Sequence, residues 1–292
     1  MRYYKHQLKF AKGKDCSTFL VISDSHIGNK AFHKEGTSIF IDKAMKYPWI
    51  HLGDIIESIT PDDRRFSAES HDATLMAQAE YSAELFGKAH KTCWGLMMGN
   101  HEWRVSTKVG DLTNHIVRNI NEKHKSNVPY LTMMAFIDII CPAGKCRSFF
   151  THGGATINYR AGEPERKSTN KKIRLKDLFS EWDADLYGMG HGHTGIVKPA
   201  IMVEKTTTRY NDNIPKRRPV PVSNQWYFMC PAMFKAHDIE SDMASYAEAY
   251  GYGATALGWI EIDIRRDGVP VCIRIMRENG TVRKEYFAEL LD

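Results

Sequence analysis

The sequence of 292 residues has no apolar run long enough to cross a bilayer. Its first ten residues mix Arg2, Lys5 and Lys9 with aromatic side chains, so they lack the apolar core of a secretory signal. Six cysteines are present without a CxxC spacing, and most have apolar neighbours, which indicates reduced, packed thiols. We therefore expect a soluble cytoplasmic protein that makes no contact with a membrane.

The excess of charge of one sign is also small, since the formal net charge is only +5. The positive residues nevertheless gather in two stretches, one from Arg160 to Asp177 and one from Lys198 to Arg218. The hydrophobic share of 42% is enough to form a sizeable core. We expect a single domain over 1–292, with the core motifs in 17–195 and a β-rich extension in 196–292.

What the sequence does contain is a series of short, β-prone apolar segments that each end at polar residues, several beside a glycine. Parallel strands place their carboxyl ends at one edge of a sheet, so polar residues that follow several such strands converge in a crevice there. The pattern predicts an α/β protein with its site at the carboxyl ends of the strands. The segments and the polar residues after them are 17–23 before Asp24 and His26, 49–52 before Asp54, 92–98 before Asn100, 148–150 before His152, and 186–189 before His191 and His193.

Helices are predicted over 66–90, over 111–125 with Asp111 as the N-cap, and over 173–181. Residues 206–221, rich in Thr, Asn and Pro, indicate a long polar loop or a β-excursion. Two β-rich runs, 256–264 and 269–276, flank a turn signal at 266–268 and predict a hairpin that completes the second sheet.

The polar residues after these strands are carboxylates, imidazoles and one amide, which are ligands for metal ions. Imidazole and carboxylate together suit Mn, Fe or Zn better than Ca or Mg. A shared carboxylate allows two ions to lie about 3.5–4 Å apart, as two-metal phosphoryl chemistry requires. The remaining histidines, which are not part of this pattern, are assigned to surface or capping positions; they include His51, His71, His90, His115, His124 and His237.

The order DxH, GDxx(D/E), GNH(D/E), a lone His and GHxH resembles the calcineurin-like metallophosphoesterase family. These motifs are Asp24-Ser25-His26, Gly53-Asp54-Ile55-Ile56-Glu57, Gly99-Asn100-His101-Glu102, His152 and Gly190-His191-Gly192-His193. The resemblance implies a four-layer αββα sandwich of two mixed sheets. It also implies that Asp24, His26, Asp54 and His193 bind one metal ion, and that Asp54, Asn100, His152 and His191 bind the second.

For the chemistry, the resemblance implies hydrolysis of a phosphoester by in-line attack of a hydroxide that bridges the two metals. It assigns His101 to the leaving group as a general acid or charge stabiliser, with Glu57 as a carboxylate that orients His101. Arg104, two residues beyond the GNHE motif, is a candidate for binding the substrate phosphate, and a surface salt bridge is an equal alternative. Manganese is the expected metal, with Fe, Zn or Ni as alternatives.

The core motifs leave the substrate open. Ser58-Ile59 follow Glu57 where phosphoprotein phosphatases have arginine and glycine, which argues against a phosphoprotein. The two basic stretches favour nucleic acid as substrate and partner, as in SbcD-type repair nucleases, and the overall layout also resembles stand-alone bacteriophage phosphoesterases. The alternatives are a phosphodiesterase or monoesterase for small nucleotides, and a binding scaffold without activity.

Overall fold

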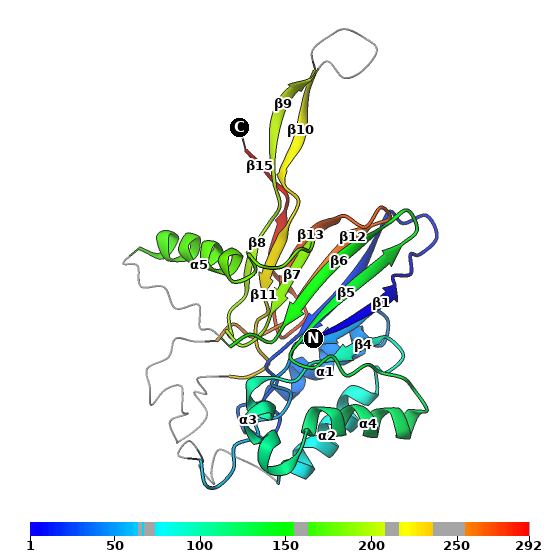
Figure 1. Ribbon diagram of the computed structural model, residues 1–292, viewed down its shortest axis with the longest axis vertical. Helices are drawn as coiled ribbons and strands as arrows, with labels where there is room; N and C mark the ends of the chain where they lie inside the picture. Colours follow the sequence, from blue (N-terminus) through cyan, green and yellow to red (C-terminus); the bar gives the residue numbers. More distant parts are fainter. Residues whose placement is uncertain (64–65, 67–73, 155–162, 208–215, 236–254, 292) are drawn as a thin grey trace.

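A computed structural model describes residues 1–63, 66, 74–154, 163–207, 216–235 and 255–291. It contains two six-stranded mixed sheets that face each other (Figure 1). The first sheet has the order β14-β13-β12-β2-β3-β4. Its strands are β2 (Cys16–Ile22), β3 (Trp49–His51), β4 (Cys93–Leu96), β12 (Ile260–Arg265), β13 (Pro270–Met276) and β14 (Val282–Phe287).

The second sheet has the order β1-β5-β6-β7-β11-β8. In this sheet β6, β7 and β11 run parallel to one another, while β5 pairs antiparallel with β6 and β8 antiparallel with β11. The strands are β1 (Arg2–Gln7), β5 (Met134–Cys141), β6 (Gly144–Thr151), β7 (Leu186–Met189), β8 (Ile196–Lys198) and β11 (Trp226–Met229).

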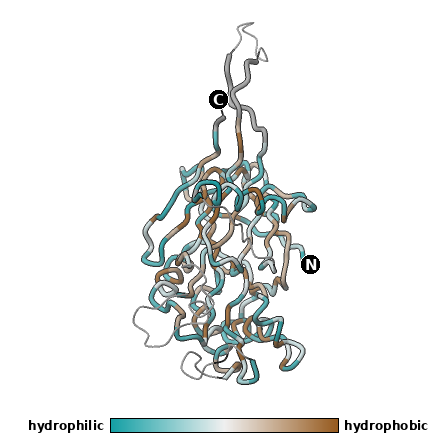
Figure 2. The backbone as a smooth tube through the Cα atoms, turned by 90° about the vertical axis from the view of Figure 1, so that its left-hand side faces the viewer, coloured by the Kyte–Doolittle hydropathy of each residue, from teal (hydrophilic) through white to brown (hydrophobic). Residues whose placement is uncertain are grey.

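The side chains of β2 explain why the sheets are layered between helices. Because successive side chains of a strand point to opposite faces, Phe19 and Val21 enter the core between the sheets, whereas Leu20 and Ile22 face the helices. Figure 2 shows hydrophobic segments running through the middle of the molecule. Both faces of this strand are buried, as its continuous apolar run predicts.

Helices cover the outer face of each sheet, which completes four layers (Figure 1). The first sheet packs against α1 (Lys34–Ala44), α2 (Leu75–Gly87) and α4 (Leu112–His124), with α3 (Asn100–Val109) beside them. The second sheet packs against α5 (Pro164–Leu178), which contributes Leu175 to its outer core. The predicted αββα sandwich of two mixed sheets is confirmed.

The helix boundaries differ from the predictions in two places. The helix α2 begins only at Leu75, where the Thr74 hydroxyl accepts a hydrogen bond from the backbone N–H of Ala77, and 67–73 of the predicted helix lie outside the described residues. The helix α5 begins nine residues before the predicted start and ends at Leu178 instead of Glu181. Its first half is polar and carries no apolar stripe, so the hydrophobic pattern of the sequence does not indicate where the helix begins. The Asp111 cap of α4 is confirmed, since its carboxylate accepts from the N–H of Asn114 at 2.9 Å.

The predicted hairpin exists as β12 and β13, but it completes the first sheet rather than the second. Strand β12 pairs antiparallel with β2, so that Ile260 lies opposite Val21 and Ile262 opposite Phe19. These isoleucines extend the core between the sheets. The burial of their apolar face therefore fixes the side of the molecule to which the hairpin is added.

A third, three-stranded sheet of order β10-β9-β15 projects from the body of the protein (Figure 1). Its strands are β9 (Ile201–Thr207), β10 (Lys216–Ser223) and β15 (Glu289–Leu291). Strands β9 and β10 pair antiparallel, so 206–207 and 216–221 of the stretch predicted as a loop or β-excursion take the second form, and 208–215 lie outside the described residues. Among the helices that the structure describes, none has the length and apolar character of a membrane span.

Candidate metal centre

The predicted ligands lie directly after the carboxyl ends of five strands from both sheets. Asp24 and His26 follow β2, Asp54 follows β3, and Asn100 follows β4 as the first residue of α3. From the second sheet, His152 follows β6, and His191 and His193 follow β7. The structure thus brings residues that are up to 169 positions apart into one cluster, as the strand pattern predicts.

The backbone at these strand ends adopts a conformation that side chains rarely take. Asp24, His26, Asp54, His191 and His193 all have positive φ values, between 46° and 63°. This left-handed region is unfavourable for residues other than glycine, and it is retained where surrounding contacts enforce it, commonly at functional sites. The sharp turns let consecutive or alternate side chains of a short loop point at the same spot.

Glycine at the neighbouring positions allows the loops to approach closely. A Cβ on Gly99 would lie 2.0 Å from the Asp54 carboxylate and 2.2 Å from its backbone nitrogen. A Cβ on Gly190 would lie 2.1 Å from the hydroxyl of Ser23. These glycines in the GNH and GHxH motifs are therefore required by packing around the ligands.

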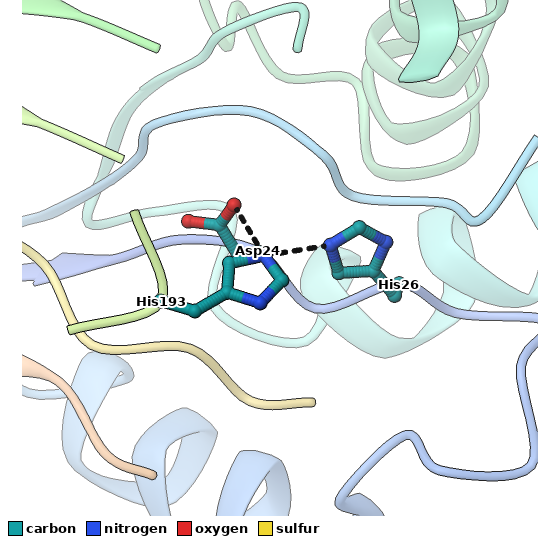
Figure 3. Close-up of side chains that lie close together, drawn as sticks. All are labelled: Asp24, His26 and His193. Atoms are coloured by element: carbon teal, nitrogen blue, oxygen red, sulfur yellow. Dashed lines mark hydrogen bonds and ion pairs between the residues drawn. The ribbon is translucent and has the colours of Figure 1, made fainter. Parts of the chain in front are cut away.

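The first group of donors consists of Asp24, His26 and His193 (Figure 3). The Nε2 atom of His193 lies 3.1 Å from Oδ1 of Asp24 and 3.2 Å from Nε2 of His26. Figure 3 shows the His193 ring between the other two side chains. Two imidazole nitrogens and a carboxylate oxygen thus face a common point.

The second group consists of Asp54, His152 and His191, with the amide of Asn100 among them. The Oδ1 atom of Asn100 lies 2.8 Å from Nε2 of His152 and 2.7 Å from Nδ1 of His191. Oδ2 of Asp54 lies 3.1 Å from Nε2 of His152 and 3.9 Å from Nε2 of His26. Asp54 therefore stands between the two groups, in the place where a shared ligand is needed.

Two of the imidazoles, those of His152 and His26, are fixed by hydrogen bonds from the ring nitrogen that faces away from the centre. The Nδ1 atom of His152 donates to the carbonyl oxygen of Leu52 at 2.8 Å, and Nδ1 of His26 lies 2.8 Å from the Glu57 carboxylate. A proton on Nδ1 leaves Nε2 as the lone-pair donor toward the centre. The tautomer that metal binding needs is the one these contacts favour.

The electrostatic field of the centre favours positive charge. Burial opposes the ionisation of Asp54 and Asp24, but nearby histidines, His152 and His193 foremost, outweigh it and hold the pKa of each carboxyl below its usual range. Burial likewise disfavours charge on His152, yet Asp54 and Asp24 raise its pKa to about 10. Two buried carboxylates that stabilise a proton this strongly would stabilise metal dications at the same place.

Glu57 and His101 lie together, but their contact differs from the predicted one. The Nδ1 atom of His101 lies 2.5 Å from the backbone carbonyl of Glu57, whereas the Glu57 carboxylate is 3.9 Å away. The Glu57 carboxylate instead contacts Nδ1 of His26. The backbone carbonyl of Glu57 therefore makes the closer contact with His101, and the carboxylate makes the closer contact with His26.

Arg104 lies apart from the donor groups in the structure. Its side chain is 59% exposed, and Nη1 lies 3.6 Å from the carboxylate of Asp63. This geometry is the surface salt bridge that the sequence left as the alternative to phosphate binding. Such exposed pairs contribute little to stability.

Two buried residues next to the ligands, His51 and the Glu102 of the GNH(D/E) motif, have no predicted role in the centre. His51, assigned to a surface or capping position, is fully buried; its Nδ1 accepts from the N–H of Gly53 at 3.1 Å, and its Nε2 lies 2.9 Å from the Ser25 hydroxyl. Burial lowers the pKa of His51 to about 3, so His51 is neutral. The sequence signal that indicates burial of His51 is its position inside the apolar run 49–52.

Glu102 accepts hydrogen bonds from the N–H groups of Ile55, Ile56 and Gly99. These bonds join the loop of Asp54 to the loop of Asn100. Burial, with Asp54 nearby, raises the pKa of Glu102 to about 7.

The donor atoms fit two transition-metal ions. The His and Asp donor atoms of each group lie no more than 4.8 Å from one another, and Asp54 also forms a third such group with His26 and His101. Imidazole nitrogens, carboxylate oxygens and an amide oxygen form a mixed set that suits such ions. Together, the sandwich fold and this centre define a metallophosphoesterase, a hydrolase of phosphoric esters.

Comparison with known proteins agrees with this class. The model of the calcineurin-like phosphoesterase family matches residues 17–214, more than half of the chain. The chain therefore belongs to the calcineurin-like phosphoesterase family. No curated protein matches it.

Solved structures resemble the chain at low identity. A predicted phosphoesterase from Streptococcus pneumoniae is 12% identical with a TM-score of 0.41, over 93% of this chain and 98% of that one. The phosphoesterase Yfce from E. coli is 10% identical with a TM-score of 0.42, over 93% and 100% of the two chains. GAP50 of Plasmodium, described as an anchor in the inner membrane complex, is 10% identical with a TM-score of 0.46, over 96% and 90%.

Proposed function

We propose that the protein is a phosphodiesterase that uses two manganese ions, held by the predicted ligands, to hydrolyse small phosphodiesters. The observation that carries this proposal is the position of Asp54 between two groups of imidazole and carboxylate donors. When bound, two such ions lower the pKa of a water molecule between them and polarise the phosphoryl oxygens. Fe, Zn and Ni accept the same ligands and remain alternatives.

The residues of the centre would have two separate roles, binding of the metal ions and protonation of the leaving group. Asp24, His26 and His193 would hold one ion and Asn100, His152 and His191 the other, with Asp54 shared. His101 is placed beside them, because its N–H donates to Oδ1 of Asp54 at 2.9 Å and its ring packs edge-on against His26 at 4.6 Å. With Nδ1–H directed at the Glu57 carbonyl, Nε2 of His101 is the atom that would deliver a proton to the leaving oxygen.

The charges around the centre favour a diester over a monoester. After burial, the groups that most affect the pKa values of Asp24, Asp54 and His152 are carboxylates and histidines of the centre, and no described lysine or arginine ranks among them. Arg104 is paired with Asp63 at the surface. Within the part of the chain that the structure describes, the second negative charge of a monoester would find no such cation beside the metal ions, whereas a diester carries only one.

The experiment is hydrolysis of bis-p-nitrophenyl phosphate and of p-nitrophenyl phosphate by protein stripped of metal with a chelator. We expect no turnover of either ester before manganese is added, and afterwards faster turnover of the diester. Undiminished turnover in chelator would refute the metal centre. A preference for the monoester would refute the diester assignment.

Nucleic acid is a second candidate substrate, favoured by a basic cluster away from the centre. Lys172 of α5 lies 6.0 Å from the Tyr286 ring, and Lys198 of β8 lies 5.5 Å from the Tyr227 ring. Burial and the charge of Lys176 lower the pKa of Lys198, so positive charges crowd there. Of the second basic stretch, 208–215, which include Arg209, lie outside the described residues.

A nuclease, including the predicted SbcD-type or bacteriophage branch, would use that cluster to bind a phosphate backbone. The same assay with single-stranded DNA, duplex DNA and RNA distinguishes the two candidates. Faster cleavage of a polymer than of the small diester, lost as salt is raised, would favour the nuclease. Equal cleavage without salt-dependent binding would leave the small diester as the substrate.

A further inference from the structure

An aromatic residue outside the family motifs lies against the first metal group. The ring of Phe234 is 4.9 Å from that of His26 and 5.8 Å from that of His193, measured between centroids. Both contacts are tilted or edge-on, with interplanar angles of 52° and 61°. Phe234 thus touches two of the side chains proposed to hold one ion, although it follows the last motif by 41 positions.

The backbone around Phe234 is fixed at this place. The N–H of the preceding Met233 donates to the carbonyl of Asp24 at 3.1 Å, and the hydroxyl of Thr255 donates to the carbonyl of Phe234 at 2.9 Å. Phe234 also forms an isolated antiparallel bridge with Phe32. Contacts with three separate segments of the chain therefore hold the backbone of 233 and 234 in place, and with it the position of the ring beside the ligands.

Exposure shows on which side of the centre the ring lies. The side chains of Asp24, Asp54 and His152 are at most 2% exposed, whereas that of His193 is 25% exposed. The side chain of His101 is 13% exposed, and Phe234 is also partly exposed. A substrate must approach from the side where these partly exposed residues lie, so the Phe234 ring borders the path to the phosphate.

We infer that Phe234 is a substrate-binding residue that contacts a planar aromatic group esterified to the phosphate. His26 has both Phe234 and the proposed acid His101 as ring neighbours, at 4.9 and 4.6 Å. A group esterified to a phosphate beside His26 and His193 would therefore lie within reach of the Phe234 ring. Aromatic pairs prefer tilted or offset arrangements at such distances, and they add to the energy of simple burial.

The inference rests on the proposed function, and it narrows the substrate to esters that carry an aryl ring or a nucleobase. These two sources share the chemistry of a flat π-system next to a phosphate. An aliphatic ester of equal charge would bind the metal ions but gain nothing from the ring. Selectivity among small diesters is thus assigned to a residue that the family motifs do not contain.

The test compares the wild type with Phe234→Leu and Phe234→Tyr in the manganese-loaded protein. Calorimetry measures the binding of phenylphosphonate and methylphosphonate, which have no ester bond to hydrolyse, and kinetics measure KM for aryl and alkyl diesters. In Phe234→Leu we expect affinity for phenylphosphonate and KM for aryl esters to worsen roughly tenfold, from the usual strength of aromatic stacking. The methyl ligands should change little, and Phe234→Tyr should retain the wild-type preference.

Phe287→Leu is the matched control, because Phe287 is 60% exposed on β14. Inhibition by adenosine monophosphate and by phenylphosphonate then separates the two sources, since a nucleobase site prefers the first and a site for a simple aryl ring prefers the second. Equal losses for phenyl and methyl ligands in Phe234→Leu, or a lowered manganese content, would overturn the inference and leave Phe234 as packing for the ligands. Absence of activity in every protein, with the phenyl preference intact in binding, would instead refute the proposed function alone.

Discussion

Replacement of Asp54 by asparagine is expected to abolish phosphoester hydrolysis, with a loss of about a thousandfold or more, because both ions lose their shared anionic ligand. The substitution keeps the shape of the side chain, and the asparagine oxygen can still accept the hydrogen bond from the N–H of His101. The negative charge that acts on His152 disappears. The measurement is kcat/KM for bis-p-nitrophenyl phosphate together with manganese content by elemental analysis.

Asp138→Asn is the matched control, since Asp138 is equally buried but pairs with Lys145 and Arg147 on β5 and β6. We expect this variant to keep its manganese and its activity. An Asp54→Asn protein that retains two ions and hydrolyses the diester at the wild-type rate would show that the carboxylate is not shared. The two donor groups would then have to be interpreted as separate sites.

His101→Ala is expected to lower kcat by about 10²- to 10⁴-fold, the usual contribution of a general acid, while both metal ions stay bound. His101 contributes its backbone N–H to Asp54, and alanine preserves that contact. The loss should be larger for diphenyl phosphate than for bis-p-nitrophenyl phosphate, because phenolate needs protonation more than p-nitrophenolate does. Steady-state kinetics on both esters measure this difference.

His115→Ala provides the comparison for this variant, since His115 lies on α4 and contacts Asn119. It should behave as the wild type. If both esters lost the same factor in His101→Ala, the imidazole would be stabilising charge rather than delivering a proton. Loss of manganese from His101→Ala would place the residue among the ligands, which its grouping with His26 and Asp54 permits.

The strand ends and their ligands could be predicted from the sequence because local pattern and global fold agree there. Apolar runs such as that of β2 have both faces buried, and the polar residues after them have no role in a core, so both signals point to the same edge of a sheet. To predict the place of the site, only one further rule was required, namely that parallel strands have their carboxyl ends at the same edge of a sheet.

The remaining features depend on contacts between distant segments. His51 looks like any other histidine until β3 is seen in the interior of the first sheet. The Glu57 carboxylate lies on His26 rather than His101, a choice between two neighbours that only the folded loops decide. Phe234 belongs to no motif, and its place against His26 is set by the backbone contacts of 233 and 234. The hairpin β12-β13 was assigned to the wrong sheet because either sheet can accept an apolar strand at its edge.

The central claim is that two metal ions share Asp54, and anomalous scattering from crystals grown with manganese tests it most directly. Two peaks about 3.5–4 Å apart are predicted, with the Asp54 carboxylate between them. One peak should be bound by Asp24, His26 and His193, and the other by Asn100, His152 and His191. A single peak, or two peaks that Asp54 does not join, would contradict the account.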